Sequence, residues 1–96
     1  MPRYELSENA RVDLSNIFEY IAADNERAAI ALVVKLLDLF RKIDDQPFMG
    51  RARSEIEEGL RSIPQGNYVV YYSVWGGNVV IARVLHASLD IDKIFS

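Results

Sequence analysis

The fold of this chain is decided by residues 60–86, which read LRSIPQGNYVVYYSVWGGNVVIARVLH. Three runs rich in β-branched and aromatic residues are separated here by two short turn signals. Pro64-Gln65-Gly66-Asn67 forms the first signal, because proline fixes φ and Gly66 and Asn67 both accept positive φ. Gly76-Gly77 forms the second, and such a pair between two β-rich runs is typical of a two-residue hairpin. The stretch therefore predicts a meander of three antiparallel strands.

Alternation along the predicted strands shows which side chains share a face. On the middle strand, both faces are apolar or aromatic: Tyr68, Val70, Tyr72 and Val74 lie on one, and Val69, Tyr71, Ser73 and Trp75 on the other. We therefore expect a central strand that is covered on both sides. On the last strand, strict alternation places Val79, Ile81, Arg83 and Leu85 opposite Val80, Ala82, Val84 and His86.

The first half of the chain supplies the cover for this sheet. Arg3–Leu6 is short and alternating, and we interpret it as a strand of the same sheet. Ser7 is a good N-cap for an amphipathic helix over Glu8–Ala23, whose polar face includes Asp13. Asp24-Asn25 caps a second, more apolar helix that begins near Glu26 and ends before Pro47. The short connection predicts an antiparallel helical hairpin lying over one face of the sheet.

The remaining segments are short. Residues 48–59 are charged and irregular, and residues 87–96 form a tail whose apolar side chains, Ile91, Ile94 and Phe95, are able to fold back. The 96 residues then make a single domain of the α+β class. Its expected order is β-α-α-β-β-β, with a small antiparallel-rich sheet packed against an N-terminal helical hairpin.

Composition limits the kinds of function. The chain has no cysteine, so thiol catalysis and thiolate metal sites are absent, and one histidine with scattered carboxylates gives no metal-ligand set. We expect no cofactor. The net charge of −3 argues against broad, sequence-independent nucleic-acid binding. We also expect no direct sequence-specific binding to nucleic acid. We see neither a signal peptide nor a membrane span and expect a cytoplasmic protein.

The order of motifs resembles the ParE branch of the ParE/RelE family of bacterial toxins from toxin–antitoxin pairs. The resemblance covers nearly the full length of the chain. It rests on Tyr4-x-Leu6-Ser7-x-x-Ala10-x-x-Asp13-Leu14-x-x-Ile17, Pro47-x-x-Gly50-Arg51, Gly59-x-Arg61, Tyr68-Val69-Val70-Tyr71-Tyr72, Ile81-x-Arg83-Val84-Leu85-His86-x-Ser88-Leu89-Asp90 and Ile94-Phe95. One departure is Asp24-Asn25-Glu26, where many ParE-like chains carry a Trp-Gly pair between the helices.

The resemblance implies a toxin that binds and inhibits DNA gyrase without being an enzyme. It also implies a ParD-like antitoxin that wraps the toxin in a hetero-oligomer. For the target, the candidate contacts are Arg51, Arg53, Arg61, Arg83, His86, Asp90 and Phe95. For the antitoxin, the candidates are Leu14, Phe18, Val33 and Leu37 on the helical hairpin, residues that core packing explains equally well, with strand addition at an open sheet edge as reinforcement.

A second hypothesis is a RelE-like, ribosome-dependent mRNA endonuclease (an mRNA interferase). Such chemistry needs cations at the scissile phosphate and a group that moves a proton. Glu57 and Glu58 stand where RelE-like chains tend to carry lysines, Val69 where an arginine is frequent, and Phe95 where a terminal tyrosine is common. The remaining catalytic candidates would be Arg61, Arg83 and His86. A third hypothesis is an inert member that only pairs with an antitoxin.

Each candidate also has a structural interpretation. Arg61 and Arg83 would close ion pairs with Glu55, Glu57 or Asp90, and His86 would be a packing residue at a strand end. Arg51 and Arg53 would belong to a solvated loop. The aromatic residues Tyr71, Tyr72 and Trp75 would be core on the two sheet faces rather than a stacking platform for single-stranded nucleic acid.

Overall fold

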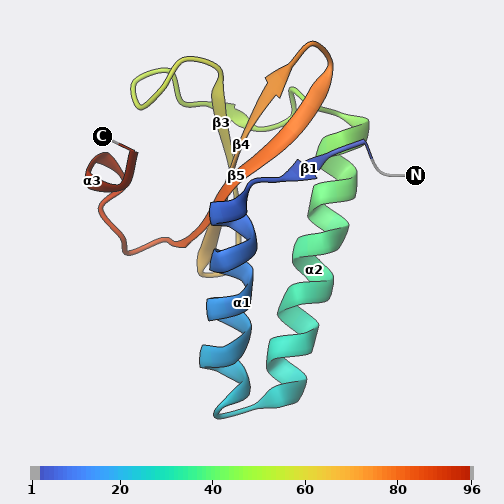
Figure 1. Ribbon diagram of the computed structural model, residues 1–96, viewed down its shortest axis with the longest axis vertical. Coiled ribbons are helices and arrows are strands. Elements are labelled where there is room, and N and C mark those ends of the chain that lie inside the picture. Colours follow the sequence, from blue (N-terminus) through green and yellow to red (C-terminus); the bar gives the residue numbers. More distant parts are fainter. Residues whose placement is uncertain (1–2, 96) are drawn as a thin grey trace.

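The computed structural model describes residues 3–95 and shows one mixed sheet with a pair of long helices on one face (Figure 1). The sheet has the strand order β1-β5-β4-β3-β2, in which β1 runs parallel to β5 and every other neighbouring pair is antiparallel. The elements are β1 (Glu5–Leu6), α1 (Glu8–Ala22), α2 (Glu26–Asp45), β2 (Arg51–Ala52), β3 (Leu60–Gln65), β4 (Tyr68–Trp75), β5 (Asn78–His86) and α3 (Ile91–Phe95). The expected α+β class and the expected order of the main elements are confirmed.

Two short elements were not expected from the sequence. The segment read as irregular contains β2, which pairs Arg51 with Ser62 and Ala52 with Arg61 on β3. The tail folds back as expected, but it does so as the five-residue helix α3. Neither element is long enough to leave a periodic pattern in the sequence.

Both long helices begin where their caps predict. The Ser7 hydroxyl accepts a hydrogen bond from the Ala10 N–H at 3.0 Å, and the Asn25 side chain accepts one from the Ala28 N–H at 3.1 Å. These bonds satisfy N–H groups that a helix N-terminus otherwise leaves without partners. The Asp24-Asn25-Glu26 connection thus ends one helix and starts the next, as expected.

Tight turns join the strands of the meander. Gly76 and Gly77 both have positive φ, at 56° and 82°, which is the requirement of a two-residue turn of type I′. In the first turn Gly66 has φ of 61°, but no non-glycine residue among those described has positive φ, so the expectation for Asn67 was wrong. Pro64 lies within β3, opposite Val69, where β2 does not reach and no neighbouring strand needs its missing N–H.

A β-bulge changes the face of the last residues of β5. Tyr71 pairs with Arg83 and Tyr72 with Ile81, so Ala82 is an extra residue without a partner on β4. One extra residue reverses the alternation that follows it. Val84 therefore packs with Val79 and Ile81 in the core under the helices, and Leu85 packs on the opposite face. The strict alternation assumed from the sequence was wrong from Arg83 onward.

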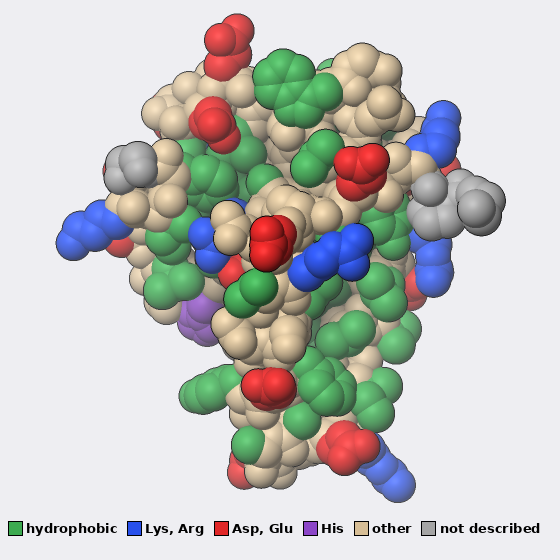
Figure 2. Space-filling model, viewed as in Figure 1, with side chains coloured by type: hydrophobic (Ala, Val, Ile, Leu, Met, Phe, Trp, Pro, Cys, Tyr) green, Lys and Arg blue, Asp and Glu red, His purple; other side chains and the backbone are tan. Residues whose placement is uncertain are grey.

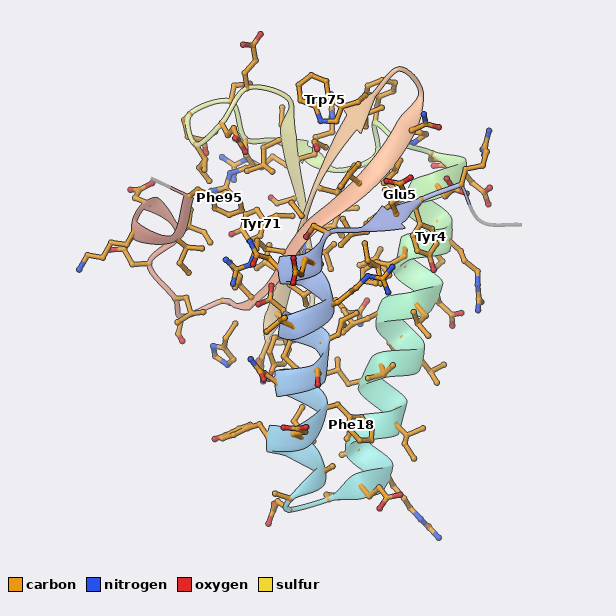
Figure 3. The ribbon with its side chains drawn as sticks, viewed as in Figure 1. Tyr4, Glu5, Phe18, Tyr71, Trp75 and Phe95 are labelled. Carbon is orange, nitrogen blue, oxygen red and sulfur yellow. The ribbon has the colours of Figure 1, made fainter. Side chains whose placement is uncertain are left out.

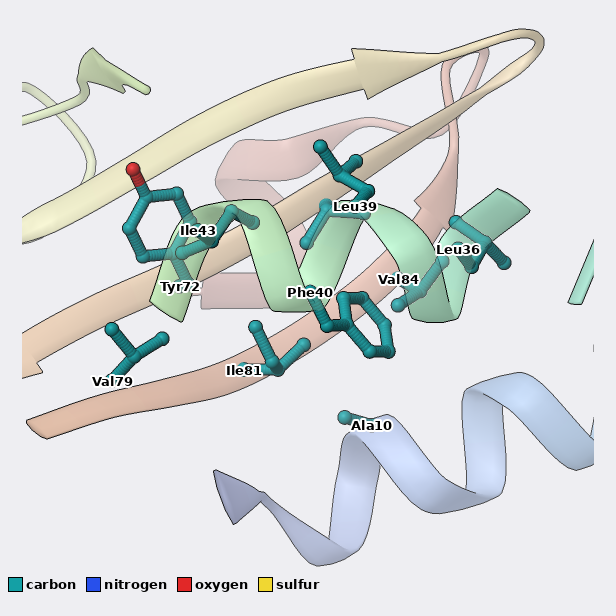
Figure 4. Packing of buried hydrophobic residues seen from close by; sticks show 10 residues of the cluster. Ala10, Leu36, Leu39, Phe40, Ile43, Tyr72, Val79, Ile81 and Val84 are labelled. Carbon is teal, nitrogen blue, oxygen red and sulfur yellow. The ribbon is translucent and has the colours of Figure 1, made fainter. Parts of the chain in front are cut away.

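The main core lies between the sheet and the helical hairpin (Figure 4). It contains Leu36, Leu39, Phe40 and Ile43 of α2, Ala10 of α1, and Val70, Tyr72, Val79, Ile81 and Val84 of the sheet. The second sheet face carries a smaller cluster of Leu60, Tyr71 and Leu85, on which the apolar side chains of α3 pack. The middle strand is thus covered on both sides. Trp75 is the exception: its side chain is 65% exposed, because it lies beside the hairpin tip beyond both clusters.

Candidate functional site

Arg61 is held by the backbone of the connector before β2. Its Nη1 atom donates to the Gly50 carbonyl at 2.7 Å and to the Phe48 carbonyl at 3.2 Å, and its guanidinium lies 5.0 Å from the centre of the Phe48 ring. The ion pair expected with Glu55, Glu57 or Asp90 was wrong, because these carbonyls take the guanidinium instead. Through its contacts with two carbonyls and one aromatic ring, Arg61 holds the connector before β2 against the sheet.

Arg83 forms the only ion pair that joins α1 to the sheet among residues 3–95. Its Nε and Nη2 atoms donate to the two oxygens of Asp13 at 2.8 and 2.9 Å, and Asp13 Oδ2 also accepts from the Val84 N–H at 3.0 Å. The hydrogen bond to Asp13 raises the pKa of Arg83. Asp13, assigned to the polar face of its helix from the sequence, is buried to 9% exposure because it faces the edge of β5. The ion pair expected between Arg83 and Glu55, Glu57 or Asp90 was therefore wrong, because Asp13 takes the guanidinium instead.

Arg53 is attached to the second face of the sheet. It donates to Glu55 at 2.8 Å and to the Ser62 hydroxyl at 3.1 Å, and its guanidinium lies 6.0 Å from the centre of the Tyr71 ring. Its hydrogen bond with Glu55 raises the pKa of Arg53 and lowers the pKa of the Glu55 carboxyl. Arg51, on β2, is exposed.

The C-terminal segment meets Arg53 at one aromatic residue. Phe95 of α3 packs on Tyr71 with their ring centres 5.3 Å apart, and Figure 3 shows the two side chains next to each other. Asp90 accepts the Asp92 N–H at 3.2 Å and so shapes the start of α3. Tyr71 therefore brings together two segments, residues 51–53 and 90–95, that lie far apart in the sequence.

His86 lies at the other end of the sheet and is exposed. Its Nδ1 atom lies 2.7 Å from the Ser88 hydroxyl and accepts the Ser88 N–H at 3.2 Å. The imidazole ring meets the edge of Tyr68 at 5.3 Å between ring centres. These contacts match the structural interpretation of a histidine at a strand end.

The three nuclease candidates do not form one site. Arg61 pairs with Tyr72 across β3–β4, whereas His86 pairs with Tyr68 across β4–β5. With a rise of about 3.3 Å per residue and strands about 4.8 Å apart, their Cα atoms are separated by roughly 16 Å. Arg83 lies on β5 and pairs with Tyr71, a position between those of Arg61 and His86 along the sheet. Its guanidinium, however, points at Asp13. No phosphate could contact all three side chains as they stand.

The four candidates for antitoxin contact all lie on the helical hairpin and are half-buried. Leu14 and Leu37 pack against the main core, while Phe18 projects between the two helices in Figure 3. Beside them on α2, Ile30 and Val34 are 48% and 50% exposed. Figure 2 shows hydrophobic side chains gathered over the two helices. We call Phe18, Ile30, Val33, Val34 and Leu37 the hairpin patch.

A groove on the other flank of α1 was not anticipated from the sequence. It has a volume of about 680 Å³ and lies between α1, the end of β5 and the segment that follows β5. Its walls include Ile17 and Tyr20 of α1, Tyr68 of β4, and Leu89. Tyr20 is 81% exposed, and its position on the outer side of an amphipathic helix was the one signal that could have indicated this groove.

Residues 3–95 contain no group of three or more histidine, cysteine or carboxylate side chains placed to hold a metal ion. Within the same residues, no helix has the length and apolar character needed to cross a membrane.

The fold and these surfaces define a small α+β protein with a helical hairpin and an antiparallel-rich sheet, in which Arg61, Arg83 and His86 lie apart. A family model described as the ParE toxin of the type II toxin–antitoxin system parDE matches residues 4–91. The chain belongs to this family of toxins.

Individual relatives agree with this assignment. The chain is 34% identical over 98 residues to Toxin ParE1 of Caulobacter vibrioides, covering 94% of both proteins. It is 29% identical over 80 residues to Toxin ParE3 of the same organism, covering 82% of this chain and 80% of the relative. A solved structure of the chromosomal ParDE TA system from P. aeruginosa superposes with a TM-score of 0.64 at 18% identity, over 86% of this chain and 92% of the other. That likeness supports the fold.

Proposed function

We propose that this toxin acts by binding rather than by catalysis, that its target is DNA gyrase, and that a ParD-like antitoxin neutralises it. One observation supports the non-enzymatic part most directly. Arg61 and Arg83, the cations that a nuclease would use, are engaged by backbone carbonyls and by Asp13. Releasing either one would cost hydrogen bonds that hold the connector or α1 in place.

The surface that we assign to the target surrounds Tyr71 on the second face of the sheet. Arg53 and Phe95 both contact this ring, and Arg51 and Asp90 lie in the adjoining segments. Arginine beside aromatic side chains is a composition that protein interfaces favour. We place Arg61 and Arg83 behind this surface as supports, and His86 outside it.

The surface that we assign to the antitoxin is the hairpin patch. An amphipathic helix of a partner can lay its apolar face into a groove between two helices. The half-exposed side chains of Ile30 and Val34 extend the apolar surface beyond the core contacts of Leu37. Covering them would remove apolar area from water, a gain of about 25 cal/mol per Å² before association costs are subtracted.

Two surface charge changes test the target assignment. Arg51→Glu places a negative charge beside Arg53, and we expect it to weaken inhibition of gyrase supercoiling about tenfold or more, as loss of an interface arginine often does. The matched control is Arg27→Glu, at the start of α2 and also exposed, which should leave inhibition unchanged. Equal inhibition by both variants would contradict this placement of the target surface.

The antitoxin assignment is tested in the same way with Ile30→Lys. A lysine at this position puts a charge into the centre of the hairpin patch, and we expect antitoxin affinity to fall about tenfold or more. The exposed Tyr20 lies on the other flank of α1 and does not belong to this patch. Antitoxin binding that is indifferent to Ile30→Lys would contradict the assignment.

A further inference from the structure

The side chain of Trp75 is 65% exposed, although the sequence predicted it as core. It follows Tyr71 and Ser73 on the second face of the sheet, because the residues that alternate with them on β4 pack in the main core. Its Nε1 atom donates to the Ser73 hydroxyl at 3.0 Å, and the tight turn at Gly76-Gly77 fixes the backbone beside it. The indole is thus held in place while most of its surface contacts water.

An indole held in this way is well suited to bind a partner. Tryptophan is enriched among the residues that carry most of the binding energy of protein interfaces. A side chain that is already fixed before binding loses less conformational freedom when a partner covers it. The groups around the ring then decide which side chains of a partner it attracts.

One carboxylate flanks the ring from the β1 side. Both neighbours of Glu5 in the sequence pack against the main core, so Glu5 itself points to the second face. Glu5 pairs with Val80 on β5, and Val80 pairs with Ser73 on β4. Two strand spacings and two residues along β4 separate Glu5 from Trp75, which places their Cα atoms roughly 12 Å apart. Figure 3 shows both side chains at this end of the sheet.

Two more carboxylates flank the ring from the β3 side. The Leu60 N–H donates to the Glu57 carbonyl at 3.1 Å, and Gly59 has φ of 82°. These are the features of a type II turn, and Glu58 lies at its corner. The paired part of β3 begins directly after this turn, beside the last residues of β4. In Figure 3, Trp75 lies between this loop and the tip of the β4–β5 hairpin.

The surface around Trp75 is therefore acidic. The side chains of Glu5, Glu57 and Glu58 are exposed, and none of them pairs with a lysine or arginine within residues 3–95. Figure 2 shows acidic side chains on either side of the hydrophobic ones at this end of the molecule. A cation is attracted to the face of an aromatic ring, and tryptophan attracts it most strongly. The carboxylates add to this attraction, whereas they repel the phosphates of a nucleic acid.

We propose that Trp75 anchors a basic segment of the toxin's protein target, with a lysine or arginine side chain over the indole and between the carboxylates. This inference rests on the proposed inhibition of gyrase, and it extends the target surface by a further anchor and by the charge of the segment bound there. Continuity favours the target over the antitoxin. Tyr71 and Trp75 lie on the same face of one strand, about 13 Å apart. The hairpin patch lies on the helices that cover the other face.

The first test compares two exposed aromatic residues. Trp75→Ala should weaken inhibition of gyrase supercoiling about tenfold, as loss of an interface tryptophan often does. Tyr20→Ala is the matched control, since Tyr20 is 81% exposed but lies on α1, and it should leave inhibition unchanged. Antitoxin binding by Trp75→Ala should equal that of wild type, which shows that the variant is folded. Inhibition by Trp75→Ala at the wild-type level would overturn the assignment.

The second test reverses one charge beside the ring. Glu58→Lys should weaken inhibition about tenfold, because like charges that meet across an interface repel each other. Glu19→Lys makes the same change at an exposed position of α1 and should have no effect. Added salt should reduce the difference between Glu58→Lys and wild type, since salt screens exposed charges. If Glu58→Lys inhibits as well as wild type, the bound segment is not basic and the inference is wrong.

Hydroxyl-radical footprinting locates the contact without any substitution. Trp75 is the only tryptophan of the chain, so mass spectrometry assigns its oxidation directly. In the complex of the full chain with gyrase, oxidation of Trp75 should slow several-fold, and oxidation of Tyr20 should not change. In the complex with the antitoxin, Trp75 should stay as reactive as in the free toxin. Protection of Trp75 by the antitoxin and not by gyrase would overturn the choice of partner.

Failure of this inference differs from failure of the proposed function. If wild type inhibits gyrase and Arg51→Glu weakens this inhibition, while Trp75→Ala and the oxidation of Trp75 show no effect, the target assignment stands and the Trp75 contact is wrong. If wild type does not inhibit gyrase at all, both are wrong.

Discussion

Asp13 connects the helical hairpin to the sheet through three hydrogen bonds, two from Arg83 and one from the Val84 N–H. Asp13→Asn removes the charge that Arg83 needs while leaving the shape of the side chain nearly unchanged. Breaking a buried ion pair costs about 3–5 kcal/mol, and the partial exposure of Arg83 reduces the expected loss to about 2–3 kcal/mol. Urea denaturation of the two proteins measures this difference.

The control for that experiment is the exposed pair between Arg41 and Asp38. Arg41→Ala should change the free energy of unfolding by less than about 1 kcal/mol, because exposed ion pairs contribute little. If Asp13→Asn were as mild as Arg41→Ala, the pair would not be structural, and Arg83 would return as a candidate for contact with a target or a substrate.

Tyr72 makes the stability of the protein sensitive to alkaline pH. Its hydroxyl donates to the Pro47 carbonyl and accepts from the Gly50 N–H, both at 2.8 Å, and burial raises the pKa of Tyr72 above its usual value of about 10. A group whose folded pKa is raised stabilises the fold below its unfolded pKa, and this contribution is lost as the pH rises through the folded pKa.

Tyr72→Phe removes this contribution along with both hydrogen bonds. We expect a loss of about 1–3 kcal/mol near neutral pH, because the Gly50 N–H is then buried without its partner. As the pH rises above about 10, the difference between the two proteins should shrink, since only wild type loses the contribution of Tyr72. Urea midpoints across that range test the prediction, and a difference that grows with pH would contradict it.

The sequence predicted the types of the decisive residues better than their partners. It indicated that Tyr71 and Tyr72 are core, but for Arg61 and Arg83 it left a structural role and a role in target contact both open. The partners could not be found, because they depend on which element lies beside the edge of β5 and on backbone carbonyls, which every residue carries. Asp13 illustrates the difficulty: a carboxylate on a helix is normally solvated, and only the position of Arg83 70 residues later explains its burial.

At the scale of elements, the connector between α2 and β3 is fixed at Gly50. A Cβ atom at this position would lie 2.5 Å from the Tyr72 hydroxyl oxygen and 2.8 Å from its ring carbon Cε1. Gly50→Ala should therefore push the ring or the connector aside and destabilise the protein by about 1–3 kcal/mol. Met49→Ala, a change at a neighbouring exposed residue, should cost less than about 0.5 kcal/mol. Thermal unfolding of both variants makes the comparison, and equal midpoints would contradict this packing.

Elements with a strong period were predictable, and short or irregular ones were not. The helices and the three strands of the meander follow from caps, glycine turns and alternation. β2 and α3 have two and five residues, too few to leave a periodic signal. The bulge at Ala82 also could not be predicted from the sequence, because nothing in a run of apolar residues shows which of them lacks a partner on the neighbouring strand.

At the scale of the whole molecule, the sheet separates the proposed surfaces. The hairpin patch lies on the helices that cover one face, and the surface around Tyr71 lies on the opposite face. Of the target candidates, the fold gathers Arg51, Arg53, Asp90 and Phe95 in neighbouring segments and places Arg61, Arg83 and His86 elsewhere. This separation predicts that Arg51→Glu weakens gyrase inhibition without weakening antitoxin binding. It also predicts that Ile30→Lys weakens antitoxin binding without changing gyrase inhibition. A shared loss in either variant would contradict two separate surfaces.

We propose that this ParE-family toxin inhibits gyrase by binding and does not cut mRNA. The most direct measurement is a supercoiling assay with purified toxin and gyrase, run beside an mRNA cleavage assay on translating ribosomes. We predict inhibited supercoiling or trapped gyrase–DNA complexes, with intact mRNA. Cuts in mRNA at codon-defined positions with unaffected gyrase would contradict the claim and would make Arg61, Arg83 and His86 the residues to test for catalysis.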